Sequence, residues 1–471
     1  MKKFHLIILF LTLQQLHAQS KAMTLQECIE YAWKNNLDLK QSMLNAESSK
    51  IDYQQSKMNQ LPNLSFSTGQ NYQFGRTIDR FTNTFVNQTT RSNNFGLSSG
   101  VMVFNGFQIR NNIKQNKENL ESVNQNIEAN KNAIALTISN LFLQLIQIKE
   151  SINNSKLQMN STLNQIDRAQ KLVDAGTTDM SSLLSLKAQL ANEELNLINN
   201  ENSENALLLS LKTSMQFPVT DELQVLMPNI ELESVKINET PIQIYESAIK
   251  FLPQVKAAIA QNNASNYLEK ISRGALLPSI SLFANVNTVF SDQAKNYTGT
   301  SNLLGYRTIG VTQVSNEAVI SPIFDVSSKV IPFNTQIKDN LGQSAGISLS
   351  WNLFNGFNTQ NQIKKAKINQ QISDLNLLKT KNTILTEINT AYNNYTAAQA
   401  RYKASENNVN AQKTSYEYIQ KRFDAGLTSS FDFISAKNNF LIAQSTFLQA
   451  KYELVFRSLV LNFYKGNKIA F

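Results

Sequence analysis

Histidine and cysteine, which carry much of enzyme and metal chemistry, are almost missing from this sequence. The 471 residues include two histidines and one cysteine. His5 and His17 both lie in an N-terminal segment that has the pattern of a cleaved export signal, so the mature chain is expected to hold no histidine. Histidine is the usual general base and the commonest metal ligand, and the lone thiol of Cys28 cannot form a zinc site or an internal disulfide. Because a phosphate loop and a nucleophile elbow are missing too, we expect no catalysis, no metal and no cofactor.

The N-terminus has the three parts of an export signal. Two lysines give a positive start, an apolar run covers residues 4–13, and the small residue Ala18 marks the expected cut. The run is too short to cross a bilayer as a helix, which disfavours the alternative of an N-terminal anchor. We predict a signal peptide at residues 1–18. Cys28 lies well past the cut in an amphipathic helix start, which favours a packed thiol over a lipidation site.

The formal net charge is +9, and its basic residues are spread along segments rich in Asn, Gln, Lys and Glu. No basic block is interleaved with aromatics, so nucleic acid is not an expected partner. Beyond the signal, no run approaches 18 apolar residues, so no transmembrane helix is predicted.

The chain repeats itself once. The sequence VFNGF at 103–107 recurs as LFNGF at 353–357, and DAGTT at 174–178 recurs as DAGLT at 424–428. Both matches have a shift of 250 residues. Two distant matches at one shift indicate an internal duplication.

Upstream of these motifs the shift is smaller. The Leu-Pro pair at 61–62 matches the pair at 277–278, and Ala32 matches Ala248, both at a shift of 216. The difference of 34 residues falls between 278 and 353, so we predict an insertion in one loop of the second copy.

Each copy has the same predicted order of elements. A helix is stopped by Pro62 or Pro278, because proline cannot continue a helix. Two strands follow, separated by a polar loop, and Gly106 or Gly356 marks the turn into a long helix. That helix ends at a second glycine turn, and a shorter helix returns. These four residues are the predicted helix–strand junctions.

The four predicted strands alternate apolar and polar side chains, although Phe283 interrupts the polar face of the third. The alternation is clearest in the last strand, whose apolar face holds Ala345, Ile347, Leu349, Trp351 and Leu353. Each run has about ten residues, which a tilted strand needs to cross a bilayer. A half-buried sheet in a soluble protein would show the same period, but the export signal and the small polar face favour a membrane barrel.

Four strands cannot close a barrel, and an open edge in lipid would leave backbone groups unpaired. Two chains give about eight strands, whose interior side chains would fill the barrel, whereas three chains give about twelve and leave room for water. We therefore predict a cyclic homotrimer.

The long helices predict a second tubular part. At 1.5 Å per residue the first one would be about 100 Å long. Its apolar positions step by four and three, a heptad seam of Ile134, Ile138, Leu141, Leu145, Ile148 and Ile152. The shorter helices, stacked end to end, nearly match its length, so each chain would give four columns of a closed cylinder.

The two glycine turns are the candidate functional site. Gly176 and Gly426 suit the left-handed residue that ends a helix, and Ser429 suits the cap of the helix that follows. Capping alone would explain these residues. The functional hypothesis adds that the turns ring the inner mouth of a passage. The candidate gate and docking residues are Gly176, Thr178, Asp179, Phe423, Gly426, Thr428 and Asp432.

In this order, the motifs resemble those of the TolC-like outer-membrane efflux and secretion channels. The resemblance rests on MTLQECIEYA at 23–32 and then on the Leu-Pro, Phe-Asn-Gly and Ala-Gly motifs, each present twice. It implies a trimer in the outer membrane of a Gram-negative bacterium, in contact with outer-membrane lipid and extending into the periplasm. It also implies a periplasmic adaptor (membrane fusion) protein and an inner-membrane pump, either proton-driven or ABC, as partners.

The sequence departs from this family at one point. Some members close the inner mouth with an Arg–Asp–Tyr network. Here Phe423 stands at the tyrosine position, Thr428 at the arginine position and Ser182 at the aspartate position. We therefore expect no charged lock, but a looser gate that uses Asp179, Thr178, Thr428 and Phe423.

The predicted fold class is an α+β membrane protein with internal duplication. Four β-strands per protomer contribute to a trimeric 12-stranded transmembrane β-barrel, and a long α-helical coiled-coil periplasmic barrel continues it. The predicted parts are a signal peptide (1–18), a first periplasmic helix (19–60), a β-hairpin with an extracellular loop (61–106), a helical hairpin (107–215), a linker (216–240), a helix (241–276), a β-hairpin with a longer extracellular loop (277–356) and a second helical hairpin (357–471).

The predicted function is a passive exit duct, with a gate at its periplasmic tip, for a tripartite efflux pump or a type I secretion system. Two alternatives stay open at this point. One is a non-conducting structural or adhesive outer-membrane barrel protein, and the other is a soluble periplasmic coiled-coil scaffold.

Overall fold

The computed structural model describes residues 22–78, 85–177, 179–227, 237–297, 302–325 and 327–467. The predicted signal peptide, residues 1–18, lies outside the described residues, as does Thr178. The chain divides into two units. The helical unit comprises Met1–Ile51, Asn116–Ser265 and Asn369–Phe471, and the sheet unit comprises Asp52–Gln115 and Asn266–Ile368.

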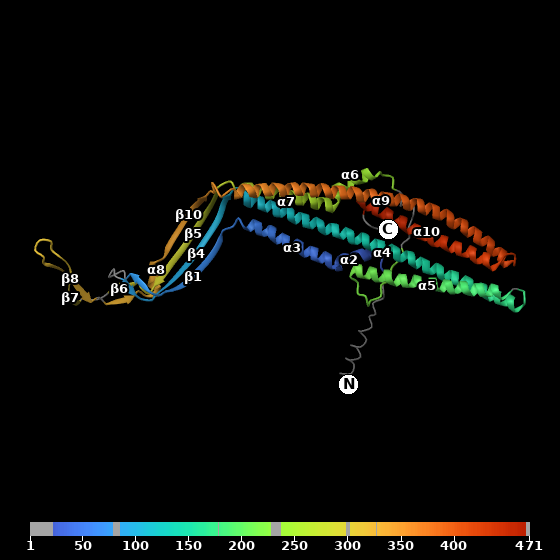
Figure 1. Ribbon diagram of the computed structural model, residues 1–471, viewed down its shortest axis with the longest axis horizontal. Helices are drawn as coiled ribbons and strands as arrows, with labels where there is room; N and C mark the ends of the chain where they lie inside the picture. Colours follow the sequence, from blue (N-terminus) through green and yellow to red (C-terminus); the bar gives the residue numbers. More distant parts are fainter. Residues whose placement is uncertain are drawn as a thin grey trace, which may run out of the picture. The chain divides into compact units, whose positions relative to one another are not determined.

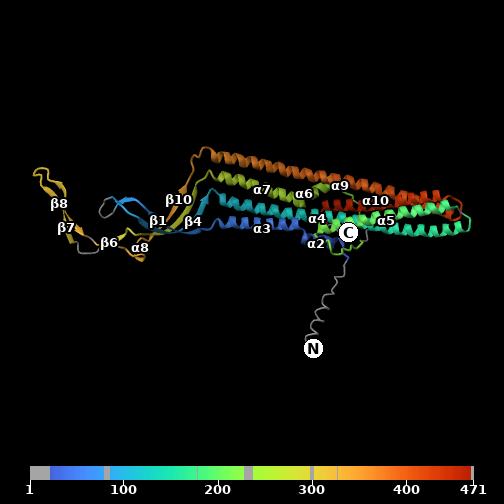
Figure 2. The same ribbon diagram turned by 60° about the horizontal axis from the view of Figure 1, so that its bottom comes forward.

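The longest helices occupy matching places in the two copies. Helices α4 (Gln108–Asp174) and α9 (Asn358–Asp424) both have 67 residues and are related by the shift of 250. Each is followed by a shorter helix, α5 (Met180–Met215) or α10 (Ser430–Tyr464), which returns beside it (Figure 1 and Figure 2). We call α4 with α5 the first hairpin, and α9 with α10 the second hairpin. None of the described helices has an apolar stretch that could cross a membrane.

The first helix of each copy, predicted as continuous, is broken in two. One copy has α2 (Leu25–Asn35) and α3 (Leu37–Met58), and the other has α6 (Pro241–Phe251) and α7 (Pro253–Gly274). The residue at each break, Asn36 or Leu252, has an extended backbone with ψ of 127° or 126°.

The two breaks are matched by the shift of 216 but have different causes. Pro253 forces Leu252 out of the helical region, since its ring clashes with the preceding residue. Asn36 breaks the other helix by capping α3, because its Oδ1 accepts a hydrogen bond from the Leu39 N–H at 3.0 Å. The matching N-caps, Thr24 and Thr240, both form capping boxes.

The core of the helical unit follows the predicted heptad seam. Ile138 and Leu145 are fully buried, and Phe142 packs with them. In the second copy the matching positions Ile388 and Tyr395 are buried in a separate cluster. Burying one such aliphatic side chain contributes about 1.5–3 kcal/mol to folding, so these clusters are the main source of stability of the hairpins.

The sheet unit is built on four antiparallel strands in the order β1-β4-β5-β10. These strands are β1 (Asn63–Gln73), β4 (Thr90–Asn105), β5 (Ser279–Ser291) and β10 (Gly342–Ser350). The last strand ends at Ser350, so Trp351 and Leu353, which the alternation had assigned to it, lie beyond it. The reason is that Ser350 pairs with Ser279, the first residue of β5 after Pro278, and no partner residue follows.

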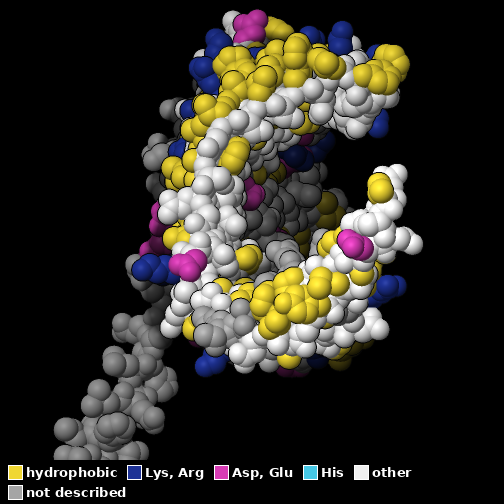
Figure 3. Space-filling view, turned by 90° about the vertical axis from the view of Figure 1, so that its left-hand side faces the viewer, with side chains coloured by type: hydrophobic (Ala, Val, Ile, Leu, Met, Phe, Trp, Pro, Cys, Tyr) yellow, Lys and Arg dark blue, Asp and Glu magenta, His cyan; other side chains and the backbone are white. Residues whose placement is uncertain are grey.

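Most apolar side chains of this sheet are open to solvent in the single chain, although Phe290 is buried. Phe66 is 68% exposed and Ile347 is 72% exposed. Figure 3 shows hydrophobic side chains gathered in patches on the face that it draws. Phe283, the exception on the polar face, lies opposite Gly346, where an added Cβ would approach its Cζ to 2.7 Å. Glycine therefore makes room for this ring.

The loops between the strands form small elements of their own. The first loop contains β2 (Arg76–Ile78) and β3 (Phe85–Asn87). The longer second loop contains β6 (Lys295–Tyr297), β7 (Asn302–Val311), β8 (Ala318–Asp325), β9 (Ser328–Val330) and α8 (Phe333–Asp339). The buried Gln336 of α8 ties this loop to β5, since its amide group bonds both the N–H and the carbonyl of Ser291 at 2.9 Å.

Candidate functional site: the glycine turns and the seam between the hairpins

Both glycine turns have the same backbone geometry. Gly176 has a φ of +71° and Gly426 a φ of +75°. In the first turn the Thr177 N–H donates to the Leu172 carbonyl at 3.0 Å, and the Gly176 N–H donates to the Val173 carbonyl at 2.9 Å. These two bonds make a Schellman motif, and the second turn repeats them. Because an added Cβ at either glycine would meet nothing within 4 Å, the backbone conformation, and not a lack of space, requires glycine.

The helices after the turns are capped by different side chains. Asp179 Oδ1 accepts from the N–H groups of Ser181 and Ser182 at 2.8 and 3.1 Å. In the second turn Ser429 Oγ accepts from the Asp432 N–H at 3.1 Å and donates to Asp432 Oδ2 at 2.7 Å. The Ser181 hydroxyl lowers the pKa of Asp179, and the Ser429 hydroxyl lowers the pKa of Asp432. Both carboxylates are therefore ionised at neutral pH.

The other two candidate residues of the second turn face their own chain. Thr428 Oγ1 donates to Asp432 Oδ2 at 3.3 Å. The ring of Phe423 stacks on Phe433, with centroids 4.6 Å apart and an angle of 17° between the planes. Phe433 is fully buried, so Phe423 holds the end of α9 against α10. Among the described residues, the candidates of one turn form no hydrogen bond, ion pair or ring contact with those of the other.

The helix–strand junctions repeat an unusual turn. Gly106 and Phe107 have φ of +64° and +63°, and Gly356 and Phe357 both have φ of +62°. Such a left-handed pair is strained for phenylalanine. The strain is offset by an edge-to-face ring pair in each copy, since the ring of Phe107 lies 5.2 Å from that of Phe104, and the second copy has the same pair at 5.5 Å.

The two copies of the junction differ in their surroundings. A Cβ added at Gly106 would come 2.1 Å from the carbonyl oxygen of Gly274, whereas at Gly356 nothing lies within 4 Å. Pro62 and Pro278, predicted to stop the two helices, lie four residues beyond the helix ends. Helix α3 ends at Met58 and helix α7 ends at Gly274.

Contacts that the sequence analysis missed join the two hairpins. We call the line along which they meet within one chain the within-chain seam; α5 and α10 contact each other there. Near the turns, Arg168 on α4 forms an ion pair with Asp424 at 2.7 Å and also donates to its carbonyl. The hydroxyls of Ser182 and Ser430 lie 3.3 Å apart.

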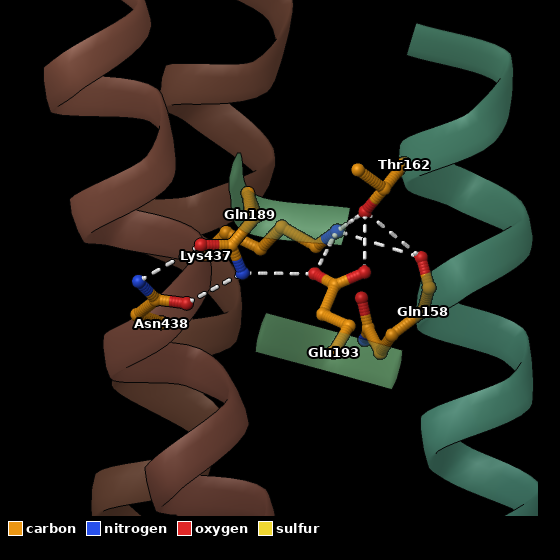
Figure 4. Close-up of polar contacts among 6 residues, drawn as sticks. All are labelled: Gln158, Thr162, Gln189, Glu193, Lys437 and Asn438. Atoms are coloured by element: carbon orange, nitrogen blue, oxygen red, sulfur yellow. Dashed lines mark hydrogen bonds and ion pairs between the residues drawn. The ribbon is translucent and has the colours of Figure 1, made fainter. Parts of the chain in front are cut away.

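A buried polar network crosses the same seam further from the turns. The Nζ of Lys437 on α10 lies 2.7 Å from Glu193 Oε1 on α5, and both side chains are almost completely buried. Lys437 also donates to Thr162 on α4, whose hydroxyl donates to Glu193 Oε2 at 2.6 Å. Gln189 and Asn438 complete the network (Figure 4). Burial lowers the pKa of Lys437, and the ion pair with Glu193 opposes this effect.

One signal in the sequence could have identified Lys437. It stands four residues after Phe433 and three before Phe440, on the stripe of α10 that faces the core. A charge in such a stripe indicates a buried partner, but the partner itself depends on how separate helices pack. Among the described residues, no group of three His, Cys, Asp or Glu side chains could hold a metal ion.

The chain combines two copies of a helical hairpin, each with a glycine turn, and a sheet with many uncovered apolar side chains. This combination is typical of a membrane protein built by internal duplication. A model of the family described as outer membrane efflux protein matches residues 28–215 and 244–467. The chain therefore belongs to the outer membrane efflux protein family, which places it in the outer membrane of a Gram-negative cell. The resemblance to TolC-like channels is confirmed, and so is the α+β class with internal duplication.

Individual proteins show the same relationship. The chain is 19% identical to the outer membrane efflux protein BepC of Brucella suis over 368 residues, which cover 78% of this chain and 70% of that protein. It is 20% identical to toxin and drug export protein A of Aggregatibacter actinomycetemcomitans, over 70% of this chain and 63% of that one. The crystal structure of the CmeC outer membrane channel of Campylobacter jejuni has a TM-score of 0.72 at 18% identity, and covers 95% of this chain and 87% of that one.

Proposed function

We propose that three copies of this chain form a passive exit duct of a tripartite efflux pump or a type I secretion system. Family membership supports an efflux role. The observation that carries the proposal is the four-stranded sheet. In the part of the chain that the structure describes, β1 and β10 are each paired on one side only, and most apolar side chains of the sheet are uncovered. Lipid would cover these side chains, and the free edges would pair with those of other copies.

The trimer follows from strand number. Three sheets of four strands give about twelve strands, wide enough for a wet interior, whereas about eight would be filled by side chains. A ring of three chains is closed and leaves no free edge. The two hairpins of each chain would then form a cylinder in the periplasm.

The glycine turns are the proposed contact for a periplasmic adaptor protein and the proposed gate. Thr428, Asp179 and Asp432 are exposed or half-exposed polar groups at the helix ends, and the two carboxylates stay charged at neutral pH. An inner-membrane pump, proton-driven or ABC, would supply the energy through the adaptor.

Partner capture from intact cells tests this function. A photo-crosslinking residue replaces Thr428 in the turn. A second one at Thr446, on the helix α10 that follows, is the control, and mass spectrometry identifies what is trapped. The expected result is an adaptor protein captured at Thr428 and not at Thr446. Conductance of the purified protein in planar bilayers is the second readout. A protein that passes no current and captures no adaptor would instead be the non-conducting structural or adhesive barrel.

A further inference from the structure

Polar contacts join the two hairpins along the within-chain seam. Besides the two ion pairs, the Tyr452 hydroxyl on α10 donates to Glu150 Oε1 on α4 at 2.6 Å. Tyr416 of α9 also bonds side chains of α4. These contacts lie along much of the seam, and the Lys437–Glu193 pair is the most deeply buried of them.

The duplication allows each contact to be compared with its counterpart. Because α4 matches α9, and α5 and α10 begin at matching residues, the shift of 250 holds through both hairpins without a gap. The counterparts of Lys437 and Glu193 are Lys187 and Ala443; those of Arg168 and Asp424 are Tyr418 and Asp174; those of Tyr452 and Glu150 are Asn202 and Ala400. None of these counterpart pairs can form an ion pair, and two of them include an alanine.

In a ring of these chains the second hairpin of one chain meets the first hairpin of the next. We call this line the between-chain seam. If the ring follows the internal symmetry of the duplication, the counterparts would face each other there. Lys187, which stands where Lys437 stands in the other copy, is exposed in the single chain. At the between-chain seam it would face Ala443, where the within-chain seam has the carboxylate of Glu193.

We propose that Lys437 and Glu193 are positioning residues that join the two hairpins of one chain into a single body, so that the passage widens by separation at the between-chain seam. The inference rests on the proposed trimeric duct. Separating the hairpins of one chain would break this ion pair together with the hydrogen bonds that join Thr162 to Lys437 and Glu193. Separating neighbouring chains breaks no such pair.

Two engineered disulfides compare the seams directly. Ser182→Cys with Ser430→Cys replaces two hydroxyls that are 3.3 Å apart and fastens the within-chain seam. The counterpart positions give the matched pair, Met180→Cys with Asp432→Cys, for the between-chain seam. Potassium chloride conductance is measured in planar bilayers before and after dithiothreitol, and non-reducing gels report which chains are linked.

We expect the within-chain disulfide to leave the conductance unchanged, and the between-chain disulfide to lower it until dithiothreitol is added. The inference is overturned if closing the within-chain disulfide lowers the conductance, or if the between-chain pair never links two chains. Wild-type protein that passes no current would refute the proposed duct instead. The next experiment does not depend on conduction.

The yield of the within-chain disulfide tests the buried pair itself. Lys437→Met should lower this yield severalfold, and Lys187→Met, the matched control in the other copy, should leave it unchanged. Glu193→Gln, which keeps the shape of the side chain, provides a second variant if Lys437→Met does not fold. Restoring the pair in reverse, with Glu193→Lys and Lys437→Glu together, should recover the yield. Equal yields in Lys437→Met and Lys187→Met would refute the positioning role.

Discussion

The two copies of the repeat agree at the helix–strand junctions and differ along the hairpins. Gly106 and Gly356 have the same left-handed backbone, and each is followed by a phenylalanine that pairs with a second ring. Along the hairpins, in contrast, Lys437 is buried against Glu193, whereas its counterpart Lys187 is exposed. The junction is specified by backbone geometry that both copies need, but the side chains of the hairpins depend on the neighbour that each copy meets.

The largest loss of folded protein is expected from an alanine substitution at one of the two junction glycines. Comparing the two positions distinguishes the effect of backbone conformation from the effect of neighbouring atoms. Gly106→Ala adds a Cβ at 2.1 Å from the Gly274 carbonyl oxygen, whereas Gly356→Ala adds one with nothing within 4 Å. Both variants have the cost of a left-handed alanine, about 1–2 kcal/mol. Only Gly106→Ala also forces the backbones apart, so little folded protein should form. The heat-resistant oligomer on gels measures this, and equal amounts for the two variants would contradict the difference between the copies.

The buried ion pair should give the next largest effect. Lys437→Met leaves a buried carboxylate unpaired and should destabilise the protein by about 3–5 kcal/mol. The double variant Lys437→Met with Glu193→Leu should recover most of this loss, since an apolar pair of similar volume is often neutral. Denaturant unfolding of the helical signal in detergent measures both variants. A double variant no more stable than the single one would show that charge is not the cause.

Removing the two helix caps should destabilise the protein by smaller and unequal amounts. Asp179→Ala removes an acceptor that serves two N–H groups, and Ser429→Ala removes one that serves a single N–H. Loss of a cap costs about 0.5–2 kcal/mol. We expect Asp179→Ala to fall at the upper end of this range and Ser429→Ala at the lower end, as read from thermal unfolding. The reverse order would mean that the second turn is the more tightly held.

The caps also predict a pH dependence. The pKa values of Asp179 and Asp432 are lowered in the folded state, so their ionised forms stabilise it above about pH 4. This contribution is lost as the pH falls through their folded-state pKa values. Asn caps a helix as Asp does but does not titrate. Asp179→Asn with Asp432→Asn should therefore lose less of its melting temperature between pH 6 and pH 3 than the wild type, and an identical loss would refute the assignment.

The smallest effect concerns the lone thiol. Cys28 is fully buried, and its counterpart at the shift of 216, Ile244, is buried at the same place in the other copy. Burial raises the pKa of Cys28 to about 12. The folded wild type should therefore show no labelling by N-ethylmaleimide at pH 7, while a protein unfolded in detergent and urea is labelled fully. Labelling of the folded protein would mean that the first helix opens.

Much of this fold could be predicted from the sequence because its signals are local. A strand of period two, a heptad seam and a left-handed glycine each require particular residues at close spacing. The break at Leu252 was missed, although Pro253 after it is a local signal that could have identified it. The break at Asn36 has no such signal, because it depends on one side-chain hydrogen bond.

The candidate site was predicted less completely. The turns and their capping residues follow from sequence, but the position of Phe423 against Phe433 and the pairing of Lys437 with Glu193 depend on how separate helices pack. No local pattern carries that information. The strands β6–β9 of the inserted loop were missed too. β6 and β9 have only three residues each, and β7 and β8 pair with two register shifts, which interrupt a regular alternation.

The gapless shift of 250 has a consequence for how such a protein evolves. A chain with one copy of the repeat could close a ring only by using the same sequence at every seam, so any mutation would change all of them at once. Two copies in one chain make two kinds of seam that can be selected separately. A single substitution at Ala443 could strengthen the between-chain seam and leave the within-chain seam unchanged. The stability of the contacts between chains can therefore evolve independently of the stability within each chain.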